Sequence, residues 1–324
     1  MMDRFSHVVK GLLLSGIFFL GLCGAAGAET PAPAPKIRTV GIFINRINRF
    51  DIKNGIAEVD FWYWMVSRCE EASLQNLELS NGKLRPLGEV VTQKQKDLFY
   101  ISRRYIAEAN CIIDTRKFPF DRQKITLSFE DGELTDDQMR FEPDIRNSGI
   151  DPAFQMNEWV IRDIRYQTGV HRYPSSFGYL DIPSGQGSDY SQFTVEVELS
   201  RRGKVWQKVV KYFWAVIVSV LAGLFALLIR PADLDARFGM AVGALFANVG
   251  CSFLLAGQLP QTPGLSTAEL VSYISLGFIM LGLLESIFSL TINNSGREKL
   301  ARRVDVAVFT VFLISYAVIW CFIF

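Results

Sequence analysis

The sequence predicts a β + α membrane protein, in which a secreted, strand-rich domain precedes a bundle of four transmembrane helices. Short alternating runs of apolar and polar residues fill the chain to about residue 203, and four long apolar segments follow. With 49% hydrophobic and 21% charged residues, the chain is too apolar for an ordinary soluble domain and too charged for a wholly embedded one. A net charge of +1 gives no general attraction to nucleic acid, so we expect no nucleic-acid partner.

Residues 1–28 are expected to form a cleavable signal peptide. Basic residues precede an apolar run there, and the small residues Ala26-Gly27-Ala28 follow it, which is the usual order of a secretory signal. The mature chain then starts outside the cytoplasm, where disulfides persist. Cys69 and Cys111 belong to the predicted soluble domain, and either a bond between them or two free thiols fits the sequence.

Residues 29–203 are expected to form an immunoglobulin-like β-sandwich. Runs such as "KITLSFE" and "SQFTVEVELS" alternate with period two and predict short strands. Asn81-Gly82 and Asp131-Gly132 predict tight turns. Many short strands without a long helical period are typical of such a sandwich.

Residues 204–324 are expected to form the membrane domain. Its four apolar segments each approach the roughly 20 residues that cross a bilayer as a helix. They cover residues 209–229, 238–259, 268–290 and 304–324. An even number of spans returns the C-terminus to the outside, so that the link between the third and fourth spans, which is basic, faces the cytoplasm. The basic residues on the outer side of the first span run against this positive-inside rule; they are Arg201, Arg202, Lys204, Lys208 and Lys211.

Three motifs stand in a fixed order along the chain. The segment "CIIDTRKFPFDRQKI" holds the core Phe118-Pro119-Phe120-Asp121, Arg201 precedes the first span in "VELSRR", and "LPQTP" links the second and third spans. Together they resemble the pentameric ligand-gated ion channels, or Cys-loop receptor family, over essentially the whole mature chain. Ile125 stands where animal members have a second loop cysteine, which resembles the bacterial type without the loop disulfide.

The resemblance implies a homopentamer in the lipid bilayer of a bacterial inner membrane, with the N-terminal domain and the C-terminus in the periplasm. A small ligand, a proton or a divalent ion would control the passage of monovalent ions. The coupling residues that the resemblance implies are Asp51, Phe118, Pro119, Phe120, Asp121, Arg201, Leu259, Pro260 and Pro263. Among them, Asp121 and Arg201 form an expected ion pair with Asp51 as a third member. The alternative is an exposed pair that contributes less than about 1 kcal/mol.

One face of the second span carries glycines and phenylalanines at helical spacing. The set is Asp235, Gly239, Gly243, Phe246, Gly250, Phe253 and Gly257. Taken alone, glycines four residues apart predict close helix packing. In a five-fold ring the resemblance places this face on the axis, where Phe246 and Phe253 form apolar constrictions that gate by excluding water.

The start of the second span bears on ion selectivity. A ring of Asp235 carboxylates favours cations, with Arg237 as the candidate partner of Asp235. Ala236-Arg237 also resembles the pattern of anion-selective members, so an anion-selective channel is one alternative. A membrane-anchored sensor that assembles without conducting is another. Glu285 is expected near the inner end, satisfied by a neighbouring helix.

In the resembling family, ligands bind between subunits under the hairpin that is here "HRYPSSFGYLDIPSGQGSDY". Its aromatic residues either form a cage for a cation such as an amine, together with Glu130, or cover the edge of the sheet. The candidates are Glu130, Tyr173, Phe177, Tyr179 and Tyr190.

The sequence favours no metal site, cofactor or enzymatic activity. The acidic run "EDGELTDD" lacks the spacing of a calcium loop and is interpreted as a solvated turn. With two histidines in the chain, no histidine-based metal cluster forms within a subunit. No nucleophile elbow or phosphate loop is present in the sequence.

Overall fold

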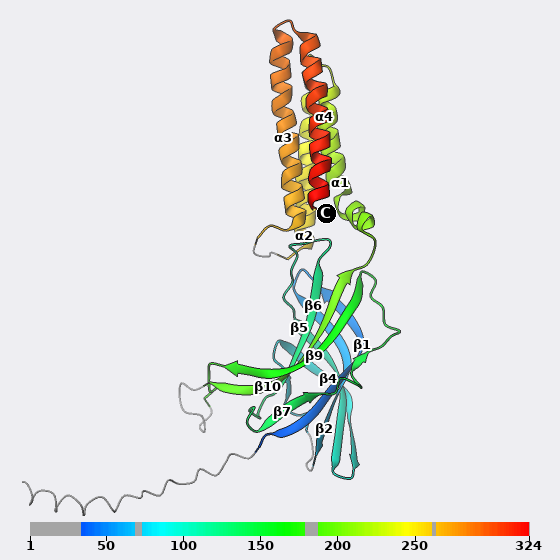
Figure 1. Ribbon diagram of the computed structural model, residues 1–324, viewed down its shortest axis with the longest axis vertical. Coiled ribbons are helices and arrows are strands. Elements are labelled where there is room, and N and C mark those ends of the chain that lie inside the picture. The colour runs from blue at the N-terminus through cyan, green and yellow to red at the C-terminus, as the bar shows by residue number, and fades with distance from the viewer. Residues whose placement is uncertain (1–33, 69–72, 179–186, 261–263, 324) are drawn as a thin grey trace, which may run out of the picture. The chain divides into compact units, whose positions relative to one another are not determined.

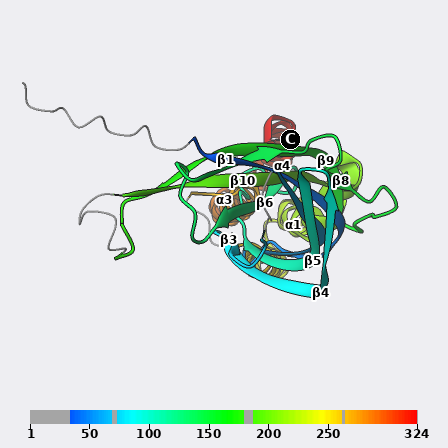
Figure 2. The same ribbon diagram turned by 90° about the horizontal axis from the view of Figure 1, so that it is seen from below.

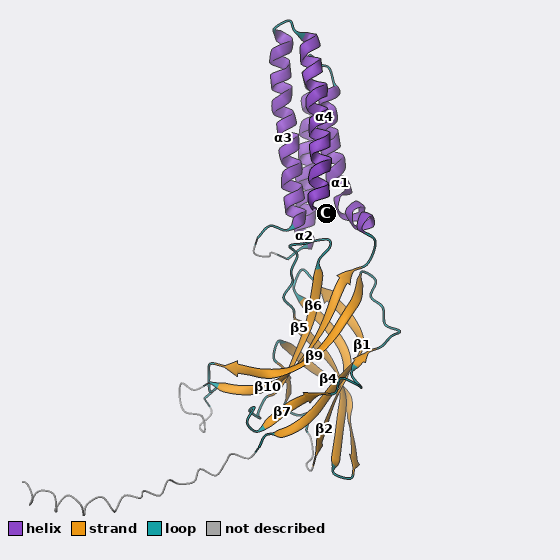
Figure 3. Cartoon of the chain, in the orientation of Figure 1, coloured by secondary structure: helices purple, strands orange, loops and turns teal. Residues whose placement is uncertain are grey.

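The computed structural model describes residues 34–68, 73–178, 187–260 and 264–323. A β-rich domain with two sheets precedes four apolar helices, as predicted (Figures 1 and 3). The predicted signal peptide, together with Cys69, Tyr179 and Pro263, lies outside the described residues. Cys111 is a free thiol.

The larger sheet contains six strands in the order β4-β5-β2-β1-β7, with β8 also paired to β1. Their bounds are β1 Lys36–Asp51, β2 Ile56–Arg68, β4 Gly82–Gln95, β5 Leu98–Asn110, β7 Met139–Pro143 and β8 Gly149–Ile150. The strands from β4 to β1 pair antiparallel, whereas β7 and β8 run parallel to β1. The prediction of short strands is wrong for β1, β2, β4 and β5, which contain 16, 13, 14 and 13 residues. In β1, bulges near Ile44 and Ile47 absorb the changes of register and keep the residues in one strand.

The smaller sheet contains four strands in the order β3-β6-β10-β9, and all neighbours are antiparallel (Figure 2). Their bounds are β3 Leu77–Leu79, β6 Arg122–Asp131, β9 Trp159–Tyr173 and β10 Ser188–Arg201. Buried side chains alternate along β10, from Phe193 to Leu199, with period two. They belong to one core cluster with Val40, Ile42 and Ile44 of β1, so residues from both sheets form the core of the domain.

The predicted turn at Asn81-Gly82 joins β3 to β4, which belong to different sheets. The Asn81 side chain donates to the Thr126 carbonyl at 2.8 Å and so fixes the turn against β6. Gly82 is required by close packing, because a Cβ atom there would lie 2.1 Å from the Glu108 carbonyl oxygen.

The acidic run that begins at the end of β6 is only in part the solvated turn that the sequence predicts. Glu133 and Asp137 are exposed, but Glu130, Asp131 and Asp136 are buried. Asp131 accepts from Arg38 Nη1 at 3.2 Å and also accepts from two backbone N–H groups of the following turn. Asp131 is therefore buried together with the groups that donate hydrogen bonds to it.

The four helices are each long and apolar enough to cross a membrane. They are α1 Val205–Phe225, extended by a 3₁₀ turn over Ala226–Leu228, α2 Leu234–Gln258, α3 Thr267–Asn294 and α4 Glu298–Ile323. The predicted apolar spans were 209–229, 238–259, 268–290 and 304–324. The helices α1, α2 and α4 begin four to six residues before them, because helical structure continues into charged sequence. At the start of α4, for example, buried Ala301 packs the first turns against the bundle.

Two of the helices leave most of their surface uncovered within one chain. By the share of each span that is buried, α1 and α3 reach 39%, whereas α2 reaches 17% and α4 only 6%. In a bilayer, an uncovered helical face meets lipid, another chain or water.

Candidate functional site

Every residue of the predicted face of α2 is exposed. We call this face the α2 stripe, and its members are Asp235, Gly239, Gly243, Phe246, Gly250, Phe253 and Gly257. Phe246 is 69% exposed and Phe253 is 74% exposed. The spacing of the sequence thus identified a continuous surface that the chain does not cover.

The glycines of the α2 stripe do not pack against helices of their own chain. A Cβ atom added at Gly239, Gly243, Gly250 or Gly257 would meet no atom of the described residues within 4 Å. Gly223 of α1 behaves differently, because a Cβ atom there would lie 3.2 Å from the Ile279 side chain. Close helix packing within one chain therefore explains Gly223 and leaves the α2 glycines unexplained.

The opposite face of α2 anchors the helix to the bundle. Its buried residues are Arg237, Ala241, Ala244, Asn248 and Leu255. Asn248 Nδ2 donates to Ser219 Oγ of α1 at 3.3 Å, and Ala244 packs in a cluster with Val220 and Ile279. Contacts on this side hold the α2 stripe outward.

Arg237 is not the partner of Asp235. Its fully buried guanidinium donates to the carbonyls of Leu227 and Ile229, each at 2.9 Å, and to Asp305 of α4. Residues two apart on a helix point to different sides, so Arg237 turns into the bundle while Asp235 stays exposed. The i,i+2 spacing in the sequence already contained this signal.

Glu285 of α3 lies buried with Asp305 and Arg237 as charged neighbours. Its charged neighbours come from other helices, as expected, but neither carboxylate oxygen has a partner with hydrogen-bond geometry among the described residues. The same holds for Arg237 Nη1 and Asp305 Oδ1. Several buried polar atoms of Glu285, Arg237 and Asp305 therefore have no hydrogen-bond partner among the described residues.

Arg201 and Asp121 form the expected ion pair, and it is buried. Arg201 Nε donates to Asp121 Oδ1 at 2.7 Å, and the two side chains are 6% and 1% exposed. The alternative of an exposed pair is therefore wrong. Gln123 Nε2 donates to the other Asp121 oxygen at 2.5 Å, which completes the carboxylate.

Aromatic rings enclose the Arg201 guanidinium. Its central carbon lies 4.7 Å from the ring centroid of Phe118, 4.6 Å from that of Trp159 and 5.8 Å from that of Tyr212. Cation–π contacts of this kind strengthen when they are desolvated. Trp159 and Tyr212 were not among the predicted residues, because each comes from a segment distant from the Phe118 loop.

The loop that carries Phe118 also contacts the helices. Phe118 is buried in a cluster with Phe213 of α1 and with Leu259, which follows α2. Backbone N–H of Thr267, at the start of α3, donates to the Arg116 carbonyl at 3.0 Å. The predicted coupling residues Phe118, Asp121, Arg201 and Leu259 thus lie together, with Pro119, Phe120 and Pro260 adjacent in the chain.

Asp51 does not join this group. Its carboxylate accepts from the backbone N–H groups of Lys53 and Asn54 and from the Asn54 side chain at 2.8 Å. The Asn54 hydrogen bonds lower the pKa of Asp51. The expected third member of the ion pair instead stabilises its own turn.

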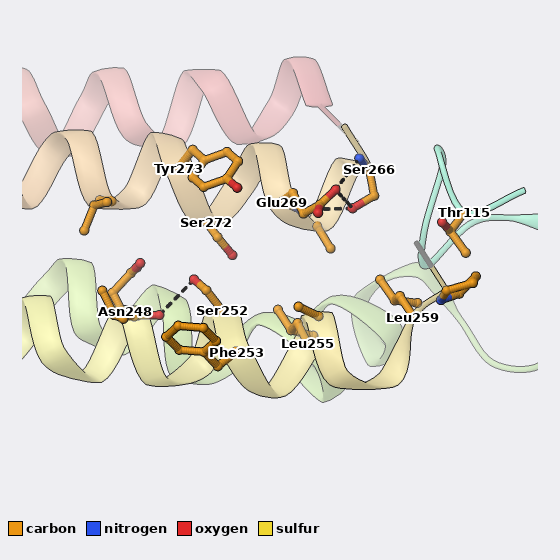
Figure 4. A pocket seen from close by; sticks show the side chains of 15 residues that line it. Thr115, Asn248, Ser252, Phe253, Leu255, Leu259, Ser266, Glu269, Ser272 and Tyr273 are labelled. Atoms are coloured by element: carbon orange, nitrogen blue, oxygen red, sulfur yellow. Dashed lines mark hydrogen bonds between the residues drawn. The ribbon is translucent and has the colours of Figure 1, made fainter. Parts of the chain in front are cut away.

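A cavity of about 590 Å³ lies between α2 and α3 beside the α2 stripe. Figure 4 shows Ser252 and Phe253 of α2 on one side and Ser272 and Tyr273 of α3 on the other. Thr115 of the Phe118 loop closes one end. The cavity therefore borders both the stripe and the loop.

The aromatic residues of the hairpin contact one another edge to face. Tyr173 lies 5.1 Å from Phe177 and 5.7 Å from Tyr190 between ring centroids. Glu130 accepts from Tyr173 Oη at 2.8 Å and contacts His171 Nδ1 at 2.6 Å. Burial and this carboxylate raise the pKa of Tyr173. Within one chain, Glu130 is therefore already held by hydrogen bonds from Tyr173 and Gln192.

No model of a known protein family matches the chain, and no curated protein matches it. Among the residues that the structure describes, no three His, Cys, Asp or Glu side chains are grouped to hold a metal ion.

Proposed function

We propose that the chain is the subunit of a homopentameric, ligand-gated ion channel in which α2 lines the pore. The observation that supports this most is the uninterrupted exposure of the α2 stripe, from Asp235 to Gly257. An exposed face in contact with lipid is expected to carry large apolar side chains, as α4 does with Ile314, Val318 and Phe322. The α2 stripe combines glycines with a carboxylate, which suits a face turned to water.

Two levels of the stripe form the gate in this proposal. Five copies of Phe246, and five of Phe253, narrow the axis to apolar rings that exclude water. Glycines between and beyond these levels leave the pore wide. Opening then requires the phenylalanine rings to move apart, which a change in the tilt or rotation of α2 achieves.

The burial of Arg237 supports cation selectivity. Its guanidinium points into the bundle, so its charge does not offset Asp235 on the exposed face. A ring of Asp235 carboxylates at one mouth then attracts cations. The alternative is an anion-selective channel, which the resemblance of Ala236-Arg237 to anion-selective members suggests. Burial of Arg237 weakens this alternative.

The buried Arg201–Asp121 pair couples the β domain to the helices. A ligand that binds the closed and open states differently shifts their equilibrium by that difference. The pair touches the loop of Phe118, which packs on Leu259 at the end of α2. Movement of the smaller sheet therefore reaches the pore helix through contacts that the chain itself makes.

The basic link between α3 and α4 supports one membrane orientation. The link between α3 and the first turns of α4 carries the exposed residues Arg297, Lys299, Arg302 and Arg303. By the positive-inside tendency this end faces the cytoplasm of a bacterial inner membrane, and the β domain faces the periplasm.

Ion current tests the proposal. The double variant Phe246→Ala, Phe253→Ala in reconstituted protein should give a measurable current, because it removes both apolar rings from the pore. Phe288→Ala is the matched control, since Phe288 is 59% exposed but lies on α3. Intact pentamers of the double variant that stay silent would favour a sensor that assembles without conducting.

Reversal potentials in a salt gradient test selectivity. Asp235→Asn should reduce the preference for cations over anions. An unchanged permeability ratio would show that Asp235 does not form the selectivity ring.

A further inference from the structure

Asp305 is an unusual residue for its place on α4. Only 6% of the α4 span is buried, and the buried residues of this helix are Ala301, Asp305 and Tyr316. Arg302 and Val306, which lie close to Asp305 along α4, are exposed. A carboxylate in a membrane helix is costly unless it has a partner, and such residues commonly mark a function. The burial of Asp305 in the bundle therefore needs a physical reason.

Arg237 of α2 is the partner of Asp305. Arg237 Nη2 donates to Asp305 Oδ2, and the two side chains are 0% and 2% exposed. The carbonyls of Leu227 and Ile229 accept from the same guanidinium at 2.9 Å each, but they carry no net charge. Glu285 lies nearby, yet neither of its oxygens has a hydrogen-bond partner among the described residues. Asp305 is thus the carboxylate that holds and neutralises Arg237.

Arg237 lies close enough to the α2 stripe to affect ions there. It follows Asp235 by two residues and precedes Gly239 by two, and both of these residues belong to the stripe. A helix with its side chains is roughly 10–12 Å across, so the buried guanidinium lies about one helix diameter from the stripe. At this distance and an effective dielectric constant of about 20, a unit charge changes the local concentration of a monovalent ion by up to roughly tenfold.

The charge of Arg237 acts on ions in the pore only where it is not neutralised. Paired with Asp305, Arg237 forms a neutral unit behind the stripe, and the field at the mouth comes from Asp235. Without the charge of Asp305, five guanidinium groups would oppose five Asp235 carboxylates across the wall of the pore. Salt screens buried charges much less than exposed ones, so this opposition would persist at physiological ionic strength.

We propose that Asp305 is a positioning residue for ion selectivity, which neutralises Arg237 and holds it inside the bundle so that the Asp235 ring decides which ions enter. A side chain on α4, outside the pore, thereby controls the charge that the pore presents. This inference rests on the proposed pore function. The simpler role, in which Asp305 only stabilises the helix bundle, predicts no change in selectivity when its charge is removed.

Reversal potentials in a salt gradient test this inference in a conducting background, the double variant Phe246→Ala, Phe253→Ala. In that background Asp305→Asn should move the reversal potential toward the equilibrium potential of the anion, because it leaves the charge of Arg237 uncompensated. The permeability ratio of cation to anion should fall by up to roughly tenfold. Adding Arg237→Gln to Asp305→Asn removes both charges of the pair and should return the reversal potential to that of the background.

The matched control is Glu298→Gln, which removes the same charge from an exposed position at the start of α4. Solvent and salt screen an exposed charge, so this variant should keep the reversal potential of the background. An unchanged reversal potential in Asp305→Asn, or an equal shift in Glu298→Gln, would overturn the inference. A shift that persists after Arg237→Gln is added would also overturn it, since Asp305 would then not act through Arg237.

Assembly of each variant is checked by native mass spectrometry before recording. If Asp305→Asn alone does not form pentamers, it is co-expressed with chains that carry only the background substitutions. The reversal potential of these mixed pentamers should shift further as the share of Asp305→Asn chains rises, and no shift at any share would overturn the inference. A background without any current would contradict the proposed function and this inference with it, whereas current without a shift in Asp305→Asn would contradict this inference alone.

Discussion

Two buried Arg–Asp pairs lie at opposite ends of the helices, and they differ in how fully their atoms are satisfied. At the junction, Arg201 and Asp121 are completed by Gln123 and by aromatic rings. At the far end, Arg237 meets Asp305, yet one nitrogen of Arg237 and one oxygen of Asp305 have no partner among the described residues.

The Arg201–Asp121 pair has its hydrogen bonds formed, whereas the Arg237–Asp305 pair leaves buried polar atoms without partners. Separating a buried ion pair whose hydrogen bonds are all formed is costly, because it leaves a buried charge without a partner. The pair beside the Glu285 carboxylate has hydrogen-bonding atoms that are not used, so another arrangement of its side chains would break fewer bonds. We therefore expect the junction to transmit movement as a unit and the far end to accommodate it.

The largest effect is expected from Asp305→Ala. It leaves the Arg237 guanidinium as an uncompensated charge in the bundle, at a cost of about 3–5 kcal/mol. Thermal unfolding of the solubilised protein, followed by tryptophan fluorescence, measures this. A loss below about 1 kcal/mol would mean that the carbonyls of Leu227 and Ile229 suffice, and the comparison would break.

Arg201→Lys should have a smaller effect. The charge remains, but the forked hydrogen bonds and the flat stacking on Phe118 and Trp159 are lost, which costs about 1–2 kcal/mol. Arg202→Lys is the control, because Arg202 is exposed and should tolerate the change. Equal unfolding midpoints for wild type and Arg201→Lys would show that charge alone matters at the junction.

Glu285→Gln should change stability by less than about 1 kcal/mol, because no formed hydrogen bond is lost. The same unfolding assay applies. A cost as large as that of Asp305→Ala would show that Glu285 is a required counter-charge of Arg237, and the far end would then resemble the junction.

The smallest effect is expected at a third pair, in the β domain, where Arg104 Nη2 lies 2.6 Å from Asp60 Oδ2 and is half-buried. The Arg104 hydrogen bond lowers the pKa of Asp60. Because the folded pKa is below the unfolded value of about 3.9, the pair stabilises the fold above that pH, and the contribution is lost as pH falls through the folded pKa.

Asp60→Asn should therefore be less stable than wild type at neutral pH, by about 1 kcal/mol or less, and the two proteins should converge in acid. Unfolding midpoints between about pH 7 and pH 3 measure this. A difference that stays constant over this range would assign the effect to packing instead of charge.

Local pattern explains what the sequence predicted well. The alternation of buried side chains in β10 and the length of each apolar helix are local patterns of the sequence. They therefore predicted a β domain followed by four helices. The α2 stripe was readable for the same reason, because helical spacing alone places Phe246 and Phe253 on one side.

Contacts between distant segments explain what the sequence missed. Arg237 and Asp305 lie 68 residues apart, and no periodicity links them. Glu130 and His171 meet only because β6 and β9 both flank β10. Asp51 was assigned to the junction by resemblance, whereas the local competition of Asn54 for its carboxylate decided its place.

Water access to the α2 stripe is the most direct test of the proposed pore. In a background without native cysteines, Phe246→Cys on α2 is compared with Ile314→Cys on α4, since these residues are 69% and 58% exposed in one chain. A charged, membrane-impermeant thiol reagent should modify the cysteine at position 246 in conducting protein and leave the one at position 314 unmodified. Protection of both positions, or equal modification of both, would contradict the assignment of the α2 stripe to a water-filled axis.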